Sequence, residues 1–337
     1  MNSYDPFVAQ LISRCRSQRA RLALPEGDDP RVVTAAGQLL ETGALAAILL
    51  FGKKDKIEAL LKAANISDPT IQIIDAEDED LASKTLSHFE SRARAKGKEI
   101  AADERAALGS SVLNQAAYYL AEGKVDAVVA GCTHTTANVI RASLKGVGMK
   151  QGIKTLSGSF VMIKAEEYFL FSDCGVVADP TAEQLADIAQ ATVDTFRQLF
   201  PTTRPKVAFL SFSTKGSAEH PRIAKVSEAT AIFNKRAPDI DADGELQFDA
   251  AYVPDVGQRK APGSKVAGAA NCFIFPDLDA GNIGYKIAQR LGGFQAYGPI
   301  LQGSEKPYLD LSRGASAKDI MVSGLLAIVR SLPESKA

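Results

Sequence analysis

The chain is organised around residues 271–293, which read N-C-F-I-F-P-D-L-D-A-G-N-I-G-Y-K-I-A-Q-R-L-G-G. Cys272–Phe275 is a short apolar run that ends at Pro276, and such a run predicts a buried strand. Asp277–Gly284 follows as a polar segment with two glycines three residues apart, which predicts a turn. Tyr285–Leu291 then has apolar residues at helical spacing, so we expect a helix there.

A second polar stretch follows a few residues later. Residues 306–319 read K-P-Y-L-D-L-S-R-G-A-S-A-K-D, and they place a hydroxyl, a guanidinium and a flexible backbone in succession at Ser312, Arg313 and Gly314. A strand, a turn that exposes backbone amides and a helix N-terminus are together suited to hold an anion. The two stretches therefore predict a site for an anionic ligand.

The first 150 residues alternate between apolar runs and segments with helical spacing. Asp29 before Pro30 predicts the start of a helix, and Gly43 predicts its end. Further helices are expected at about 1–20, 54–64, 79–95 and 103–122, and strands at 21–25, 45–51, 71–74 and 125–130. This β–α alternation predicts an open, doubly wound and mostly parallel sheet.

The pattern changes after Arg141. Thr155–Met162, Tyr168–Ser172 and Gly175–Val177 are close-set strand candidates without helices between them, which predicts an antiparallel insertion. Thr181 begins a long amphipathic helix. Its expected core residues are Leu185, Ile188, Val193, Phe196 and Leu199, and the elements expected next are a strand at Val207–Ser211 and a helix at Arg222–Arg236.

The length of 337 residues fits two domains. We expect a first α/β domain of residues 1–150 plus 302–337 and a second α/β domain of residues 151–301. A final helix at about 316–331 would then pack on the N-terminal domain.

Composition limits the classes of function. Hydrophobic residues make up 46% of the chain, enough for a sizeable core, and the net charge is −1, which gives no general electrostatic case for nucleic acid or an anionic membrane. No run approaches the length of a membrane span, and the N-terminus lacks a signal pattern, so we expect a cytoplasmic protein.

Cysteine and histidine usage limits the chemistry further. The four cysteines form no C-x-x-C pair, which favours reduced thiols, and the three histidines lie far apart, so no zinc site is expected. The sequence also contains no G-x-x-x-x-G-K-[ST] and no G-x-G-x-x-G, which weakens kinase, ATPase and dinucleotide interpretations.

Long motifs carry a resemblance to a known family. They are F-P-D-L-x-A-G-N-I-x-Y-K (275–286), L-x-G-x-x-A-x-G-P-I-L-Q-G, D-L-S-R-G, D-G-E-L-Q-F-D-A-A (243–251), V-x-x-x-K-A-P-x-S (256–264), S-F-S-T-K-G-S-A (211–218), A-L-P-E-G-D-D-P-R and A-G-C-T-H-T-T-A-N-V-I-R. In these motifs the chain resembles the phosphate acetyl/butyryltransferase family over nearly its whole length, and most closely its acetyl-transferring members.

The resemblance implies both architecture and activity. The fold expected is two α/β domains, each an open sheet flanked by helices as in isocitrate and isopropylmalate dehydrogenases, with the active-site cleft between them. The reaction expected is direct transfer of an acetyl group between acetyl-CoA and inorganic phosphate, giving acetyl phosphate and CoA. Coenzyme A is then a substrate, no other cofactor or metal is expected, and the chain is expected to form a homodimer.

Two alternatives stay open. Butyryl transfer would differ only in the apolar room of the acyl pocket. A non-catalytic, acetyl-CoA-sensing domain is the second, and the intact S-R-G and Asp319 argue against it.

The resemblance places the catalytic groups in the second stretch. Arg313 is expected to clamp a phosphate or acyl phosphate, because a guanidinium matches that anion bidentately. Ser312 is expected to donate to the thioester carbonyl oxygen or to orient the thiol. Asp319 lies where the family has its proposed thiol-deprotonating base, but Ser316 and Asp319 also fit the S-x-x-[DE] helix-capping pattern, and both roles stay open.

Other residues are expected to bind CoA or phosphate. Arg141 corresponds to an anion-binding arginine of the family, and Arg92 to another, although Arg94 is an alternative because the chain is one residue longer before Gly97. The remaining expected contacts are Ser211, Ser213, Lys215, Asn282 and Lys286, whereas Tyr285, Cys132 and Cys174 are expected to serve packing.

Overall fold

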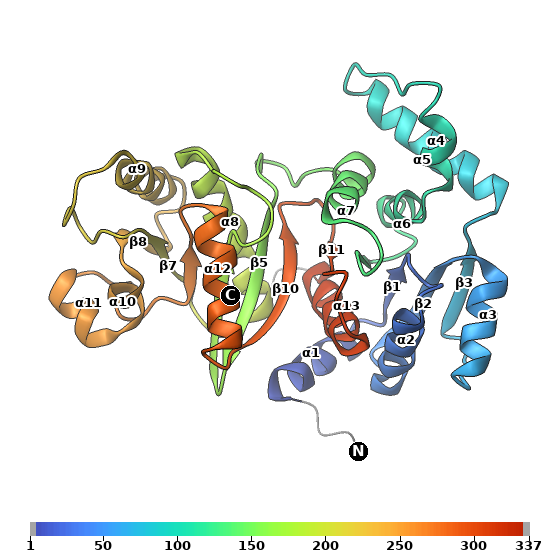
Figure 1. Cartoon of the computed structure of the whole chain (residues 1–337), viewed down its shortest axis with the longest axis horizontal. Helices are drawn as coiled ribbons and strands as arrows, with labels where there is room; N and C mark the ends of the chain where they lie inside the picture. The colour runs from blue at the N-terminus through green and yellow to red at the C-terminus, as the bar shows by residue number, and fades with distance from the viewer. Residues whose placement is uncertain (1–4, 333–337) are drawn as a thin grey trace. The chain divides into compact units, whose positions relative to one another are not determined.

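Residues 5–332 are described by the computed structural model, and they divide into two α/β units. The first unit runs to residue 150 and resumes at residue 304, and the second unit comprises residues 151–303. Figure 1 shows the order of the helices and strands by colour. The predicted α/β class, with sheets flanked by helices, is confirmed.

The first unit is built on a five-stranded sheet in the order β11-β4-β1-β2-β3, with every pairing parallel. The strands are β1 (Ala20–Leu24), β2 (Leu45–Gly52), β3 (Ile71–Asp75), β4 (Ala127–Ala130) and β11 (Tyr308–Asp310). Every residue of β4 and β11 is buried, as expected for parallel strands covered on both faces. This sheet is the doubly wound sheet that the β–α alternation predicted.

The helices of the first unit begin and end largely where local signals place them. Asp29 caps α2 through the Arg31 amide, Pro30 is its first residue, and Gly43 ends it with φ of 59°. These helices are α1 (Pro6–Arg16), α2 (Pro30–Thr42), α3 (Lys54–Ala63), α4 (Glu79–Arg94), α5 (Arg105–Ser110), α6 (Val112–Ala121), α7 (Thr136–Ala142), the π turn Ser143–Val147 and α13 (Ala317–Ser331). Helix α13 packs on α1, α2 and β4, as expected for the last helix.

The single helix expected at 103–122 is wrong, because the chain breaks it into α5 and α6. Ser111 has extended backbone angles, with φ of −72° and ψ of 119°. Gly109 packs so closely on α4 that an added Cβ would lie 2.7 Å from the Ala82 carbonyl oxygen. We infer that the close packing of α5 on α4 fixes the axis of α5, and that α6 follows a different axis.

The second unit has a mixed six-stranded sheet in the order β10-β5-β6-β9-β7-β8. The pairs β10/β5 and β5/β6 are antiparallel and the other three are parallel. The strands are β5 (Ser157–Lys164), β6 (Glu167–Ser172), β7 (Lys206–Leu210), β8 (Asp241–Leu246), β9 (Cys272–Ile274) and β10 (Gln295–Gln302). The antiparallel strands expected as an insertion are thus part of the main sheet.

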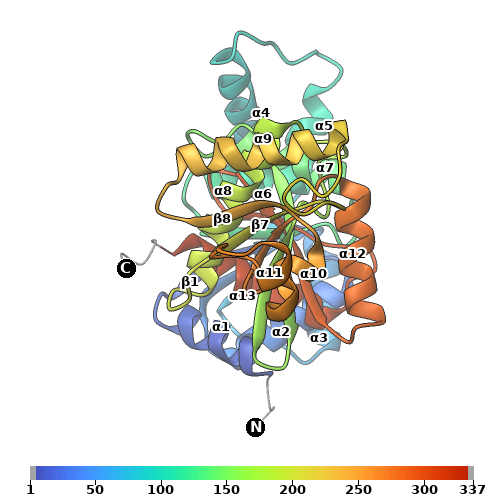
Figure 2. The same ribbon diagram turned by 90° about the vertical axis from the view of Figure 1, so that its left-hand side faces the viewer.

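Helices cover both faces of the second sheet. Helices α8 (Ala182–Leu199) and α9 (Pro221–Arg236) pack on each other and on one face, and α10 (Phe248–Tyr252), α11 (Pro254–Lys260) and α12 (Leu278–Arg290) cover the other (Figure 2). Thr181 caps α8, and the five core residues expected in that helix are all buried.

The strand expected at Gly175–Val177 is wrong. Its backbone amides donate to the buried Asp173 carboxylate, from Gly175 at 2.8 Å, Val176 at 3.2 Å and Val177 at 2.7 Å. Gly158 donates to the same carboxylate at 2.9 Å. The segment is a loop because a side chain, and not a neighbouring strand, satisfies its donors.

The turn expected at Asp277–Gly284 is also wrong, because these residues form the first two turns of α12. Asp277 caps the helix by accepting from the Ala280 amide at 2.9 Å. An added Cβ on Gly281 would lie 2.1 Å from the Asp173 carbonyl oxygen, and one on Gly284 would lie 3.1 Å from the Phe275 ring. The two glycines serve close packing and not a turn.

None of the helices within residues 5–332 has the length and apolar character needed to cross a membrane.

Candidate active site

The strand order of the first unit reverses between β1 and β4. From β1 the chain adds β2 and β3 on one side, and then β4 and β11 on the other. In open α/β sheets, ligands bind outside the carboxyl ends of the strands at such a reversal. The loops that follow β1, β4 and β11 are therefore the place to look for a site, and they contain Glu26, residues 131–135 and Ser312–Gly314.

Glu26 organises the loop after β4. Its Oε2 accepts from the Gly131 and Cys132 amides, each at 2.8 Å, and its Oε1 accepts from the Thr133 and His134 amides at 2.8 and 2.9 Å. The side chains of the last three residues also bind it, through Sγ at 2.9 Å, Oγ1 at 2.8 Å and Nδ1 at 2.7 Å. One buried carboxylate thus fixes four consecutive residues.

These contacts decide the charges of the cluster. Burial of Glu26 opposes its ionisation, but hydrogen bonds from His134, Cys132 and Thr133 outweigh burial and hold its pKa below the ordinary value. The hydrogen bond with Glu26 raises the pKa of His134. Burial, and then the bond to Glu26, raise the pKa of Cys132, so its thiol stays protonated and is a poor nucleophile.

Arg31 joins two of the three loops. Its Nη2 donates to the Cys132 carbonyl at 2.9 Å, and its Nη1 donates to the carbonyls of Arg313 at 2.8 Å and Ala315 at 3.0 Å. Asp29 holds the guanidinium through an ion pair at 2.8 Å. The backbone around Ser312 and Arg313 is therefore tied to the loop after β4.

The three expected catalytic residues lie at the surface of the first unit. Ser312 and Arg313 are exposed, and the Ser312 hydroxyl oxygen accepts from the Gly314 amide at 3.2 Å. Asp319 forms a capping box with Ser316: its Oδ2 accepts from the Ser316 amide at 2.9 Å and the Ser316 hydroxyl at 2.8 Å. The capping role of Asp319 is confirmed, and its role as a base stays a prediction.

The other expected residues of the first unit differ in how strongly they are held. Arg141 is exposed on α7 and donates to Asn138 Oδ1 at 3.0 Å. Arg92 donates to the carbonyls of Lys145 at 3.0 Å and Val147 at 2.7 Å, which fixes the π turn. The choice between Arg92 and Arg94 as a ligand-binding arginine stays open.

In the second unit, a buried carboxylate closes the loop that follows β7. Glu245 accepts from the Ser213 hydroxyl at 3.0 Å and the Gly216 amide at 2.8 Å. Ser213 is fully buried, Ser211 Oγ accepts from the Ser213 amide at 3.3 Å, and Lys215 pairs with Asp243. The shape of the loop is thus held by a residue 32 positions from Ser213.

Helix α12 carries the other two expected residues of this unit. Asn282 donates to the Cys174 carbonyl at 3.1 Å, and exposed Lys286 donates to Asn282 Oδ1 at 2.7 Å. Tyr285 stacks on Phe160 with ring centroids 3.9 Å apart, so its expected packing role is confirmed. Asn282 thereby links α12 to the loop that Asp173 organises.

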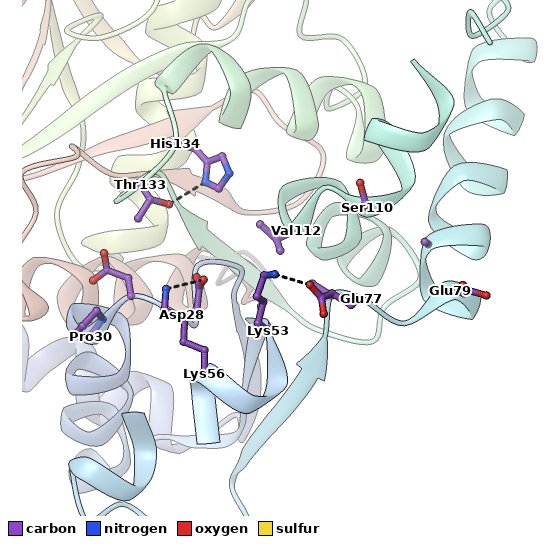
Figure 3. Close-up of a pocket in the computed structure, with 14 residues that line it drawn as sticks. Asp28, Pro30, Lys53, Lys56, Glu77, Glu79, Ser110, Val112, Thr133 and His134 are labelled. Carbon is purple, nitrogen blue, oxygen red and sulfur yellow. Dashed lines mark hydrogen bonds and ion pairs between the residues drawn. The ribbon is translucent and has the colours of Figure 1, made fainter. Parts of the chain in front are cut away.

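A pocket of about 760 Å³ opens in the first unit beside His134 (Figure 3). Its rim carries two ion pairs, Lys53 with Glu77 at 2.7 Å and Lys56 with Asp28 at 3.2 Å. None of the expected site residues lines it. Because both lysines already pair with carboxylates, we assign no phosphate to this pocket.

A model of the phosphate acetyl/butaryl transferase family matches residues 6–328. The chain belongs to this family. The resemblance seen in the sequence motifs is thereby confirmed.

Relatives within the transferase family match nearly the whole chain. A phosphate acetyltransferase of Bacillus subtilis is 39% identical over 329 residues, which covers 96% of this chain and 100% of the relative. A phosphotransacetylase structure from Streptococcus pyogenes has a TM-score of 0.89 at 40% identity, covering 96% and 98% of the two chains. The EutD phosphotransacetylase of Staphylococcus aureus has a TM-score of 0.86 at 37% identity, covering 96% and 99%.

Sequence reasoning missed the residues of this transferase that hold the loops. Glu26 and Arg31 lie in the motif A-L-P-E-G-D-D-P-R, which carries the resemblance without indicating a role for either residue. Asp310 lies two residues before Ser312 of the S-R-G triplet, and only its place after an apolar run indicated a role. Glu245 lies inside D-G-E-L-Q-F-D-A-A, a motif that carries the resemblance without indicating a role for this residue.

Proposed function

We propose that the chain is a phosphate acetyltransferase that transfers an acetyl group reversibly between acetyl-CoA and inorganic phosphate. The observation that carries this proposal is the identity of 39% to the Bacillus subtilis phosphate acetyltransferase along the full length of that relative. The retained Ser312, Arg313 and Asp319 support it. We further propose that the protein acts in the cytoplasm, supported by four buried cysteines that are free thiols.

The reaction needs a nucleophile, a stabilised oxyanion and a leaving group. In the synthetic direction a phosphate oxygen attacks the thioester carbonyl, the carbon–sulfur bond breaks, and the CoA thiolate takes up a proton. In the reverse direction the CoA thiol must lose that proton, and Asp319 is the proposed base. Direct transfer is supported by burial of Cys132 and Cys174, which raises the pKa of both thiols and disfavours an acyl-cysteine intermediate.

Ser312 and Arg313 are proposed to act on the acyl phosphate. The Ser312 hydroxyl accepts one hydrogen bond through its oxygen, so its own proton is still available for the developing oxyanion. Arg31 donates to the backbone carbonyl of Arg313, and this contact fixes the Arg313 backbone. Because the contact does not involve the Arg313 guanidinium, that group is left to bind the acyl phosphate.

The remaining expected residues are proposed to bind the anionic parts of CoA and phosphate. Arg141 and Arg92 supply guanidinium groups in the first unit, and Lys215 and Lys286 supply ammonium groups in the second. Ser211, Ser213 and Asn282 contribute hydroxyl, amide or carbonyl groups of the loops that Glu245 and Asp173 hold. That both sets act on one pair of substrates stays a prediction of the family resemblance.

The experiment that tests the function is release of free CoA thiol from acetyl-CoA, with and without inorganic phosphate. A phosphate-dependent release that yields acetyl phosphate supports the proposal. Butyryl-CoA in the same assay measures acyl preference, and faster turnover of butyryl-CoA would favour the butyryltransferase alternative. Binding of acetyl-CoA without release would favour the sensing domain.

We also propose that the protein is a homodimer that uses α12. Ile283, Ile287 and Leu291 are 56%, 53% and 85% exposed, and their spacing of four residues places them on one helix face. An exposed apolar stripe of this kind marks an interaction surface. The family resemblance favours a second copy of the chain as the occupant.

Replacing Ile287 by glutamate is expected to convert the dimer into a monomer, because the charge would be desolvated in the interface. Light scattering checks the mass, which should fall toward the 35.8 kDa of one chain. Ala231→Glu, at an exposed position of α9, introduces the same charge elsewhere and should leave the dimer intact. A wild-type protein that is monomeric at micromolar concentration would refute the proposal.

A further inference from the structure

Asp310 is a buried carboxylate that the proposed chemistry does not use. It ends β11, two residues before Ser312, and is 1% exposed. Its Oδ2 accepts from the Thr136 hydroxyl at 2.6 Å. Its Oδ1 is buried and has no hydrogen bond of normal geometry among residues 5–332, and the Leu311 amide is the backbone donor that interacts with the carboxylate. A buried acceptor so weakly satisfied is rare and costly, so its presence needs a physical reason.

The backbone around Asp310 is shaped to fit the carboxylate. A Cβ added to Gly131 would lie 2.4 Å from Oδ1 of Asp310 and 2.8 Å from the Leu311 amide nitrogen. Gly131 also has φ of 110°, where side chains are strained. Asp310 therefore lies directly against the loop after β4, while its main chain continues into the S-R-G loop.

This placement is unfavourable for the stability of the protein at neutral pH. Burial raises the pKa of Asp310 from 3.8 to about 6, and the negative charge of Glu26 also raises it, whereas hydrogen bonding from the Thr136 hydroxyl and the Leu311 amide lowers it. A carboxyl group whose pKa is higher in the folded state stabilises the fold fully below pH 3.8, the pKa of the unfolded state. This stabilisation is lost as the pH rises through about 6, the pKa of the folded state. Stability alone would favour an uncharged side chain here.

Few other titratable groups face Asp310. Glu26, after β1, keeps its charge because hydrogen bonds lower its pKa, although burial opposes this. Tyr308 on the same strand is fully buried, donates to the Leu113 carbonyl at 3.0 Å, and has a raised pKa because of burial. From α7 the contact is the neutral Thr136 hydroxyl. Among the described residues, α13 contributes no buried charged side chain and β4 contains none.

We propose that Asp310 is a positioning residue that fixes the S-R-G loop relative to the start of α7 through its hydrogen bond to Thr136. Thr136 is the first residue of α7, the helix that carries Arg141. The contact therefore sets how Ser312 and Arg313 lie relative to Arg141 within the first unit. This inference rests on the proposed acetyl transfer, because only then do these three residues act on substrate.

The test is Asp310→Asn, which keeps the size and the acceptor for Thr136 but removes the charge. The variant should melt at a higher temperature than the wild type at pH 8 and show no such gain at pH 5, because the wild-type carboxyl is protonated there. Because asparagine keeps the hydrogen bond to Thr136, the kcat/KM of Asp310→Asn for phosphate should stay near that of the wild type at pH 8. Asp310→Leu removes the acceptor, and its kcat/KM for phosphate should fall on the order of tenfold, since small misplacement of reacting groups is costly. A merely structural residue would change the melting temperature without changing the kcat/KM of the folded protein.

Thr136 supplies the matched variants. Thr136→Val removes the donor at constant shape and should also lose activity on the order of tenfold. The double variant Asp310→Leu/Thr136→Val should lose little more than either single one, as expected for one shared contact. Thr136→Ser keeps the hydroxyl and should restore most of the activity. These variants carry the test even if Asp310→Leu does not fold.

The outcomes separate this inference from the proposed function. A wild-type protein without phosphate-dependent thiol release would overturn the function, and with it the positioning role. An active wild type with an equally active Asp310→Leu or Thr136→Val variant would overturn the inference alone. Additive losses in the double variant, a tenfold loss in Asp310→Asn, or an Asp310→Asn protein no more stable than wild type at pH 8 would also overturn it.

Discussion

Replacing Arg313 by alanine is expected to lower kcat/KM by on the order of a hundredfold or more, because a charge-assisted contact to the transferring group is worth about 3 kcal/mol or more. The fold should tolerate the change. Arg313 is exposed, and its contact with Arg31 is made through the backbone carbonyl, which alanine keeps. Steady-state kinetics and a melting curve on the same sample check both parts of the expectation.

Cys174→Ser is the control for this experiment. The Cys174 side chain is fully buried, and burial raises the pKa of its thiol well above the ordinary value. A buried, protonated thiol is a poor nucleophile, so the serine variant should keep most of its turnover. If the serine variant were inactive while Arg313→Ala stayed active, a covalent acyl-cysteine route would replace direct transfer.

Replacing Asp319 by asparagine is expected to slow turnover roughly a hundredfold while leaving the melting temperature within a few degrees of the wild type. Asparagine can still accept from the Ser316 amide and hydroxyl, which Asp319 Oδ2 does now, so the helix cap is kept. It cannot take a proton from the CoA thiol, whose pKa should lie near the ~8.5 of a cysteine thiol. The residual rate should therefore rise with pH as the thiolate forms unaided.

Ser316→Ala separates capping from catalysis. It removes the hydroxyl that accepts from the Asp319 amide at 3.2 Å, which should cost about 1 kcal/mol of stability and leave the chemistry mostly intact. The two variants thus have opposite signatures. A near-parental rate and an unchanged pH profile for Asp319→Asn would leave Asp319 with its capping role alone.

Local signals predicted the elements whose ends are set by neighbouring residues. Helix α2 begins and ends where Asp29, Pro30 and Gly43 place it, since capping and backbone preference act within a few residues. The segment from Asp277 to Gly284 misled because its glycines suggested a turn. Glycine is needed at these two positions because the helix packs closely against Asp173 and Phe275, and the spacing of residues in the sequence does not reveal such contacts.

The same limit applies to the site. The family motifs pointed to the exposed groups Ser312, Arg313 and Asp319, because such motifs contain the residues that the family resemblance assigns to the reaction. The buried carboxylates that hold the loops act over long separations: Glu26 binds residues more than a hundred positions away, and Asp310 binds Thr136 across 174 positions. The order of the strands in the sheet decides which of these distant residues meet. Local hydropathy does not predict the order of parallel strands.

The four buried cysteine thiols can report local or global unfolding of the chain. Burial raises the pKa of Cys15 to about 12, and it also raises the pKa values of Cys132, Cys174 and Cys272. An alkylating reagent reacts with thiolates, so it labels these residues only when the surrounding structure opens. Two thiols lie in each unit. Pulsed alkylation followed by mass spectrometry would therefore measure the opening free energy of each unit separately, without an added probe.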